Sequence, residues 1–399
     1  MVEGQPGEVV VVGGGIVGLT VAWQARRLGA AVSVIERDTV GAATSHVAAG
    51  MLAPAAEVEF GAAGRRLLGL GLRSAEMWPA FAHELAEASG VQLGLRRTGT
   101  LLLARDEDEV GELERAFAFR RSLGLNVERL RPSQAREREP ALAPTLRLAL
   151  ELPDDHSVDP RQVLRALRLA CEREGVQLRE HAPVSGLETD GERVRGVRLI
   201  DGERVMGDAV VLAVGPWSEQ IEGLADTARV PVRPLKGQIL RLRDPAGPGM
   251  LERVVRYEGG YLVPRGDGRY VLGATVEERG FELEPTAGGV YELLREAREL
   301  VPGITELEIE ELSVGLRPST PDNLPVIGWG ALEGLLWATG HHRNGILLAP
   351  LTGSLIMGLL GGGEQDDAEL LEGCAPSRFT AGSAFSPATF AGDPAGVSR

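Results

Sequence analysis

The nine residues VVVGGGIVG, from Val10 to Gly18, decide the fold of this 399-residue chain. They place a β-branched run directly before the pattern GxGxxG at positions 13–18. A helix-forming segment follows and ends at Gly29, and a second apolar run, Ala31 to Ile35, leads into Glu36. Strand, tight turn, helix and strand in this order predict a βαβ unit of a parallel sheet.

The three glycines of the pattern, Gly13, Gly15 and Gly18, have separate roles. The first permits the tight turn, the second lets a pyrophosphate approach the backbone, and the third lets the helix pack on the strand. The pyrophosphate then meets the free N–H groups of the helix N-terminus. Glu36 would accept hydrogen bonds from ribose hydroxyls and repel a 2′-phosphate, which disfavours NADP. We therefore predict a dinucleotide site, with a glycine-rich turn that binds nothing as the alternative.

This fingerprint alone does not separate FAD from NAD, but three other segments favour FAD. Residues 44–52 are small and follow the second strand, so an extended cofactor could lie against their backbone. A later β-branched strand ends at Gly215 and could cover the cofactor from another side. Residues 340–345 lead into an apolar helix, whose N-terminus would stabilise a reduced flavin anion.

Composition and charge exclude several classes of protein. Acidic residues number 57 against 42 basic ones, a net charge of −15, which argues against binding to nucleic acid or to an anionic membrane surface. Cys171 and Cys374 form no CxxC motif and no metal-ligand spacing is present, so we expect no metal and a reducing compartment, the cytoplasm. The uncharged stretch 345–363 is interpreted as a buried helix with Pro350 in its first turn, and not as a membrane span.

The order of the elements predicts an α/β protein with two interleaved lobes. A Rossmann-type FAD-binding domain would comprise residues 1–85, 145–225 and 320–379. A second, α+β substrate domain on a mostly antiparallel sheet would comprise residues 86–144 and 226–319. Residues 380–399 are rich in glycine, serine, alanine and proline and predict a flexible tail.

Five motifs carry a resemblance to a known family. They are VVVGGGIVG at 10–18, AAGML at 48–52, YLVPR at 261–265, GLRP at 315–318 and GHHRNGILLAP at 340–350. With these motifs the sequence resembles the FAD-dependent D-amino-acid oxidase and amine oxidase superfamily, and within it most the glycine oxidases of the thiamine pathway. The resemblance runs in order from Val9 to Phe379. The sequence departs from this family at Ala53, at His342 and in the loop 258–260.

The resemblance implies a role for each residue that matches a family motif. Ile16, Val17, Glu36 and Arg37 would line the adenosine half of FAD, and Val184 would contact the adenine. Thr44, Ser45, Ala49, Gly50 and Met51 would wrap the cofactor toward its ring. His341, His342, Arg343, Asn344, Gly345, Ile346 and Leu347 would cradle the flavin. Arg317 would hold the substrate carboxylate, Tyr261 would assist it, and Arg343 would lie at the site.

The implied reaction is oxidation of glycine or another small amine or amino acid, such as sarcosine or a D-amino acid, by dioxygen. It would give an imine or oxoacid and hydrogen peroxide, with a homotetrameric enzyme and a hand-off to a thiazole synthase. Two alternatives stay open: a dehydrogenase of the same fold with another electron acceptor, and a non-catalytic FAD-binding sensor. Arg317 could also be a structural arginine and Tyr261 a core tyrosine. His46 does not match the position of a covalent flavin link, so we expect non-covalent FAD.

Overall fold

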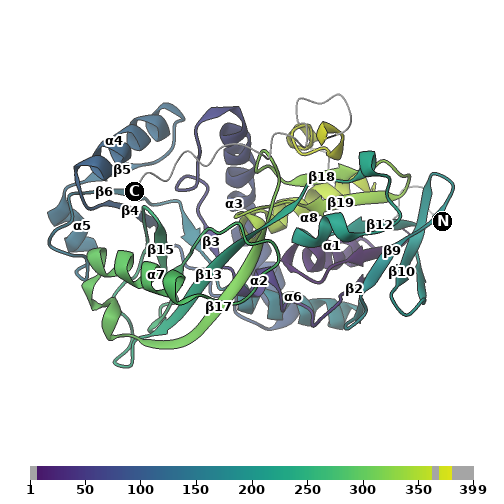
Figure 1. Cartoon of the computed structure of the whole chain (residues 1–399), viewed down its shortest axis with the longest axis horizontal. Helices are drawn as coiled ribbons and strands as arrows, with labels where there is room; N and C mark the ends of the chain where they lie inside the picture. Colours follow the sequence, from purple (N-terminus) through teal and green to yellow (C-terminus); the bar gives the residue numbers. More distant parts are fainter. Residues whose placement is uncertain (1–6, 362–367, 380–399) are drawn as a thin grey trace.

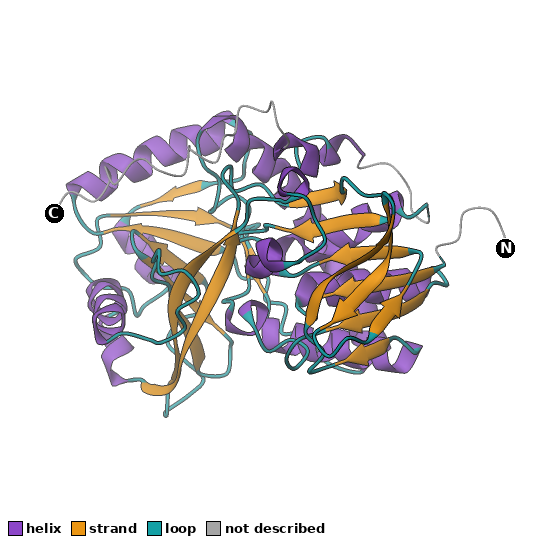
Figure 2. Cartoon of the chain, turned by 45° about the vertical axis from the view of Figure 1, so that its right-hand side comes forward, coloured by secondary structure: helices purple, strands orange, loops and turns teal. Residues whose placement is uncertain are grey.

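The structure is a computed structural model that describes residues 7–361 and 368–379. The expected flexible tail, 380–399, lies outside the described residues. Two large β-sheets stand side by side along the long axis of the molecule, each with its own helices (Figures 1 and 2). No helix in the described part of the chain is both long and apolar enough to cross a membrane.

The first sheet has six strands in the order β18–β19–β12–β1–β2–β8. Their bounds are β1 (Glu8–Val12), β2 (Ala31–Ile35), β8 (Gln177–Arg179), β12 (Ala209–Leu212), β18 (Val326–Trp329) and β19 (Leu335–Thr339). All neighbouring strands are parallel except the pair β18–β19. Helix α1 (Ile16–Arg27) connects β1 to β2, which confirms the predicted βαβ unit at the start of the chain.

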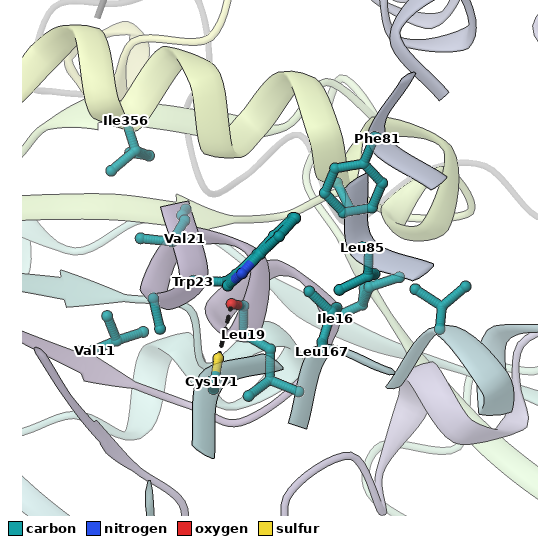
Figure 3. Close-up of a cluster of buried hydrophobic side chains, with 14 of the residues drawn as sticks. Val11, Ile16, Leu19, Val21, Trp23, Phe81, Leu85, Leu167, Cys171 and Ile356 are labelled. Atoms are coloured by element: carbon teal, nitrogen blue, oxygen red, sulfur yellow. Dashed lines mark hydrogen bonds between the residues drawn. The ribbon is translucent and has the colours of Figure 1, made fainter. Parts of the chain in front are cut away.

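Alternating side chains of β1 bury both faces of this sheet. Val9 and Val11 contribute to a core with helices, while Val10 and Val12 contribute to a second core on the opposite face. The helices are α1, α3 (Gly61–Ser89), α6 (Pro160–Glu174) and α8 (Gly345–Leu359). Figure 3 shows part of their core, where Trp23 and Phe81 pack edge to face with ring centroids 5.7 Å apart.

The opposite face is covered by a small antiparallel sheet. It has the order β11–β10–β9, with bounds β9 (Val184–Asp190), β10 (Arg193–Leu199) and β11 (Arg204–Met206). The first sheet is therefore enclosed by helices on one side and strands on the other, as a mostly parallel sheet requires.

The second large sheet has eight strands in the order β17–β13–β16–β15–β14–β4–β6–β5. Their bounds are β4 (Thr100–Ala104), β5 (Glu128–Leu130), β6 (Leu148–Leu152), β13 (Arg233–Arg243), β14 (Val254–Tyr257), β15 (Gly260–Pro264), β16 (Arg269–Gly273) and β17 (Glu308–Ser319). Every neighbouring pair is antiparallel except β14–β4. This confirms a second α+β part on a mostly antiparallel sheet.

Three helices accompany this sheet: α4 (Glu107–Ser122), α5 (Pro132–Arg138) and α7 (Ala287–Leu300). Leu293 and Leu300 of α7 join its main core, and Leu113 and Phe117 of α4 pack on a smaller one. The remaining elements are α2 (Thr44–Val47), α9 (Ala368–Leu371), β3 (Met51–Leu52), β7 (His156–Ser157) and the 3₁₀ turns η1 (Gly215–Gln220), η2 (Asp226–Ala228), η3 (Pro302–Glu306) and η4 (Pro376–Phe379).

The division of the chain into a cofactor domain and a substrate domain stays a prediction. Membership of the two large sheets supports it over most of the chain. One segment differs from the predicted division. Leu148–Leu152 belongs to the expected cofactor domain, but it forms β6 of the eight-stranded sheet. We propose that the boundary lies just after this strand.

The apolar helix near the end of the chain is buried as expected, but its start is not where we predicted it. Helix α8 begins at Gly345, so Pro350 lies inside the helix and not in its first turn. Proline lacks the N–H that would bond to Ile346 four residues earlier. Ile346 lines the large cavity described below, and Pro350 is fully packed in the protein core.

Candidate active site

A cavity of about 950 Å³ runs between the two large sheets and receives residues from both. The residues predicted for cofactor or substrate that line it are Gly13, Gly15, Ile16, Val17, Glu36, Arg37, Thr44, Ser45, Ala49, Gly50, Met51, Val184, Gly215, Tyr261, Arg317, His341, His342, Arg343, Asn344, Gly345 and Ile346. Two predicted residues, Gly18 and Leu347, do not line it. A cavity of this size is at the upper end of ordinary ligand sites and can hold an extended cofactor.

The glycine-rich turn has the close backbone contacts that its pattern predicts. Gly13 has φ +103°, and a Cβ there would lie 2.5 Å from the carbonyl oxygen of Ala213. A Cβ at Gly18 would lie 1.9 Å from the carbonyl oxygen of Gly13. Gly18 thus serves the packing of α1 on the turn, while Gly13 and Gly15 leave the start of α1 open to the cavity.

The N-terminus of α1 can receive a pyrophosphate. Its first turn contains no acidic residue, so the free N–H groups and the helix dipole favour an anion. The Ser45 hydroxyl oxygen accepts a hydrogen bond from the Ile16 amide at 3.1 Å. Its own hydrogen is therefore free to be donated to a phosphate oxygen at the same place.

Glu36 lies at the end of β2 and organises the turn around the expected ribose. Its two carboxylate oxygens accept from the Gly14 amide at 2.7 Å and from the Asp38 amide at 2.9 Å. Each oxygen keeps a lone pair for a ribose hydroxyl. The Arg37 guanidinium lies over the Trp217 ring, 3.6 Å from its centroid, and both residues line the cavity.

The start of α8 forms the other end of the cavity. Asn344, Gly345 and Ile346 line it, and the first turn of this helix also lacks an acidic residue. Leu347 instead packs in the helical core, where its carbonyl accepts from the Ser74 hydroxyl at 2.7 Å and from the Trp78 indole at 2.8 Å. Its assignment to the cofactor is therefore not supported by its position.

The two histidines before α8 are uncharged at neutral pH. Burial lowers the pKa of His341 to about 4, and its Nε2 lies 2.9 Å from the Thr352 hydroxyl. Burial, together with Arg343 and Arg317, lowers the pKa of His342 to about 3. In the described part of the chain no group of three or more metal-ligating side chains is assembled.

Together these features fit FAD. A dinucleotide can lie along the open start of α1 with its ribose at Glu36, and a flavin can reach the start of α8, where a helix dipole stabilises negative charge. His46 does not line the cavity, and its carbonyl accepts from Arg161 at 3.2 Å and from Arg241 at 2.9 Å. This position favours a non-covalent cofactor.

Arg317 reaches the cavity from β17, in space that a glycine provides. A Cβ at Gly237 would lie 2.5 Å from both terminal nitrogens of its guanidinium. Nη1 donates to the carbonyl oxygens of Lys236 at 3.3 Å and Thr275 at 3.1 Å. The guanidinium forms no ion pair with a carboxylate of the described residues, so its positive charge is available to an anionic ligand.

Tyr261 lies beside Arg317 and depends on a second glycine. A Cβ at Gly273 would lie 2.5 Å from the Tyr261 hydroxyl. Burial lowers the pKa of Arg317 below its usual value, and Tyr261 partly offsets this effect. Burial also raises the pKa of Tyr261, so the phenol stays protonated and can donate to a carboxylate.

The sequence interpretation missed two charged residues of the site, Glu57 and Arg256. Glu57 is the acceptor of a hydrogen bond from Arg256 and pairs with Nη2 of Arg343 at 3.0 Å. Burial alone would raise the pKa of Glu57, but Arg256 and Arg343 more than offset it and hold the pKa below its usual value. Arg256 could have been found from the hairpin β14–β15, whose two-residue turn places it opposite Tyr261.

Comparison with known proteins agrees with this geometry. The family model "FAD dependent oxidoreductase" matches residues 8–359. Glycine oxidase of Geobacillus kaustophilus is 35% identical over 88% of this chain and 92% of that protein. A crystal structure of glycine oxidase from this organism has a TM-score of 0.84 at 34% identity and covers 91% of this chain and 97% of that chain.

Two further relatives show the breadth of the similarity. The bifunctional protein ThiO/ThiG of Synechocystis is 36% identical over 93% of this chain, but this chain spans only 54% of that protein. Iminodiacetate oxidase of Chelativorans has a TM-score of 0.80 at 29% identity and covers 89% of this chain and 96% of that chain. Fold, cavity and sequence therefore agree: the chain belongs to the FAD-dependent oxidoreductase family that contains the glycine oxidases, and it is a flavoenzyme that acts on amino or amine groups.

Proposed function

We propose that this protein is an oxidase of glycine and of other small amino acids or amines, including sarcosine and D-amino acids. One observation carries the proposal: the Arg317 guanidinium faces the cavity beside the Tyr261 phenol and forms no ion pair with a carboxylate of the described residues. A guanidinium and a phenol that converge in this way suit a small carboxylate. The similarity to glycine oxidases supports glycine as the substrate.

The residues of the site would act by orientation and electrostatics. Arg317 would bind the carboxylate through two parallel N–H bonds, which fixes both its position and its rotation. Tyr261 would donate a third hydrogen bond to it. The bound substrate then has only its amino group and α-carbon left to present toward the start of α8. FAD, held between the start of α1 and the start of α8, would supply the redox chemistry, as the acceptor of a hydride and the donor of electrons to dioxygen.

Dioxygen as the acceptor and hydrogen peroxide as the product belong to the proposal. Hydrolysis of the imine by water gives the oxoacid and ammonia from a primary amino acid, or the oxoacid and methylamine from sarcosine, and one dioxygen is consumed for each substrate oxidised. The fusion in the Synechocystis relative supports a hand-off of the imine to a thiazole synthase in thiamine biosynthesis. A homotetrameric assembly and a cytoplasmic location stay predictions.

Steady-state assays in air test the proposal. Glycine, sarcosine and D-alanine should each yield peroxide equal to the dioxygen consumed, without an added electron acceptor. Methylamine, which lacks the carboxylate, should be a poor substrate. Turnover that requires an added quinone would favour the dehydrogenase, and failure of every amine to bleach the flavin would favour the sensor.

We predict that the rising limb of the pH–rate profile belongs to the substrate amine. Glu57, His341 and His342 have lowered pKa values, and Tyr261 has a raised one, so none of them titrates between about pH 6 and 9. Activity should rise with pH until the bound amine is neutral and then level off. The limb should move between glycine and sarcosine, whose amine pKa values differ. A limb that stays at one pH for both substrates would point to a group of the enzyme.

We also predict that FAD is released intact when the protein is denatured in acid. His46 lies outside the lining of the cavity, so its imidazole is not placed to form a covalent bond to the flavin. Centrifugation of the acid precipitate should leave a colourless pellet and a yellow supernatant. A pellet that stays yellow after washing would show a covalent bond and contradict this prediction.

A further inference from the structure

We propose that Glu57 determines specificity by excluding substrates that carry a second acidic group. This inference rests on the proposed function, since it takes Arg317 as the anchor of the single substrate carboxylate. Three of the arginines that line the cavity, Arg256, Arg317 and Arg343, act on Tyr261 at its substrate end. Glu57 occupies two of them and leaves Arg317 for the substrate.

The contacts of Glu57 use both of its carboxylate oxygens. Oε1 accepts from Arg256 and also lies 3.3 Å from Nη2 of Arg343, while Oε2 lies 3.0 Å from the same nitrogen. The Arg256 and Glu57 side chains are largely buried, with 15% and 11% of their surface exposed. The protein therefore supplies, from its own chain, the carboxylate that would otherwise come from a dianionic ligand.

Two buried ionisable side chains, those of Asp155 and Arg120, hold the turn that carries Glu57. Asp155 accepts from the amides of Ala55 at 3.1 Å and Ala56 at 2.6 Å. Arg120 donates to the carbonyl oxygens of the same two residues at 2.8 and 3.0 Å. These contacts fix the backbone of residues 55 and 56, and so hold the turn from which the Glu57 side chain reaches the two arginines.

This placement has an electrostatic consequence for the choice of substrate. A second carboxylate near Arg256 and Arg343 meets the negative charge of Glu57, and it finds both guanidiniums already hydrogen-bonded. A neutral residue of the same shape at position 57 would leave the largely buried Arg256 and the partly exposed Arg343, whose side chains are 15% and 36% exposed, without the carboxylate that now pairs with both. A dianionic ligand would then restore the charge balance of the cavity. One of its carboxylates would bind Arg317, and the other would bind Arg256 and Arg343.

Binding of acetate and malonate to the FAD-loaded protein tests this inference without turnover. Both are carboxylates that the enzyme cannot oxidise, and each dissociation constant follows from the change in the visible flavin spectrum. Wild type should bind acetate in preference to malonate. Glu57→Gln should shift the ratio of the two constants toward malonate by roughly tenfold to a hundredfold, as expected for one charge-assisted contact. In Glu57→Gln, the ratio of kcat/KM for iminodiacetate to kcat/KM for glycine should rise above the wild-type ratio by a similar factor.

Glu59→Gln is the matched control, because Glu59 is two residues away, exposed, and acts on Arg343 through its charge; it should change the ratio by less than twofold. Adding Arg256→Gln to Glu57→Gln should remove most of the gain for malonate. If Glu57→Gln does not retain FAD, Arg256→Gln alone gives a second test: malonate binding should weaken by more than acetate binding does.

Two results would overturn the inference. One is a malonate-to-acetate ratio in Glu57→Gln within twofold of wild type. The other is tighter binding of malonate than of acetate by the wild-type protein. Failure of the proposed function looks different, because acetate binding would then survive Arg317→Ala. The shift in the ratio at position 57 would still be measurable in that case.

Discussion

Replacing Arg317 with alanine should lower kcat/KM for glycine by roughly 10²–10⁴, which corresponds to about 3–5 kcal/mol of transition-state binding. The reason is that glycine has no side chain, so its carboxylate is the main group by which the site can orient its α-carbon. The Arg317 guanidinium can donate a hydrogen bond to each oxygen of that carboxylate. Gly237 provides the space that the guanidinium occupies. Steady-state kinetics with glycine measure the loss directly.

Arg317→Lys should be nearly as harmful, because an ammonium is a point charge without the planar fork. Methylamine turnover, already slow, should fall little further in either variant. FAD content and melting temperature should stay close to those of wild type, since the guanidinium forms no ion pair with a carboxylate of the described residues and donates to two backbone carbonyls. Arg173→Ala is a suitable control, because its guanidinium also donates to a backbone carbonyl but lies outside the cavity. Loss of folding in Arg317→Ala alone would show that Arg317 is a structural residue.

Gly18→Ala should abolish most FAD binding and destabilise the protein by about 1–3 kcal/mol or more. A methyl group at this position would lie 1.9 Å from the carbonyl oxygen of Gly13. This neighbour is backbone and cannot rotate away, so α1 must move off the turn that receives the pyrophosphate. The ratio of flavin to protein absorbance after gel filtration, together with the melting temperature, reports both effects.

The matched control is Gly69→Ala, in helix α3. A Cβ there meets no atom within 4 Å, and alanine is favoured over glycine in a helix interior by roughly 0.5–1 kcal/mol. This variant should load FAD normally and be slightly more stable than wild type. Equal FAD content in Gly18→Ala and Gly69→Ala would contradict the role of Gly18 in packing.

Local patterns were enough to predict much of the fold. The βαβ unit at the start of the chain and the burial of the apolar helix near its end both follow from neighbouring residues. Helix α8 starts earlier than predicted, at Gly345. Its first turn begins with a glycine and precedes a proline, which makes the local signal weak, and packing against other helices extends it.

The candidate site was only partly predictable for a different reason. Residues on one short motif, such as those around Gly13 or Arg343, can be assigned from sequence because the motif itself places them. The pair Glu57–Arg256 is separated by 199 positions, and only the pairing of β14 with β15 and β4 brings Arg256 to the cavity. Leu347 shows the opposite case, because adjacency to the motif suggested a contact, whereas the residue lies outside the cavity lining and its carbonyl accepts from Trp78.

Anaerobic mixing of the FAD-loaded protein with glycine tests the proposed function without a contribution from dioxygen. We predict that the visible flavin absorption disappears, that admission of air restores it, and that peroxide forms in an amount equal to the flavin. Arg317→Ala should bleach far more slowly under the same conditions. A flavin that stays fully oxidised in the presence of glycine, sarcosine and D-alanine would contradict the account.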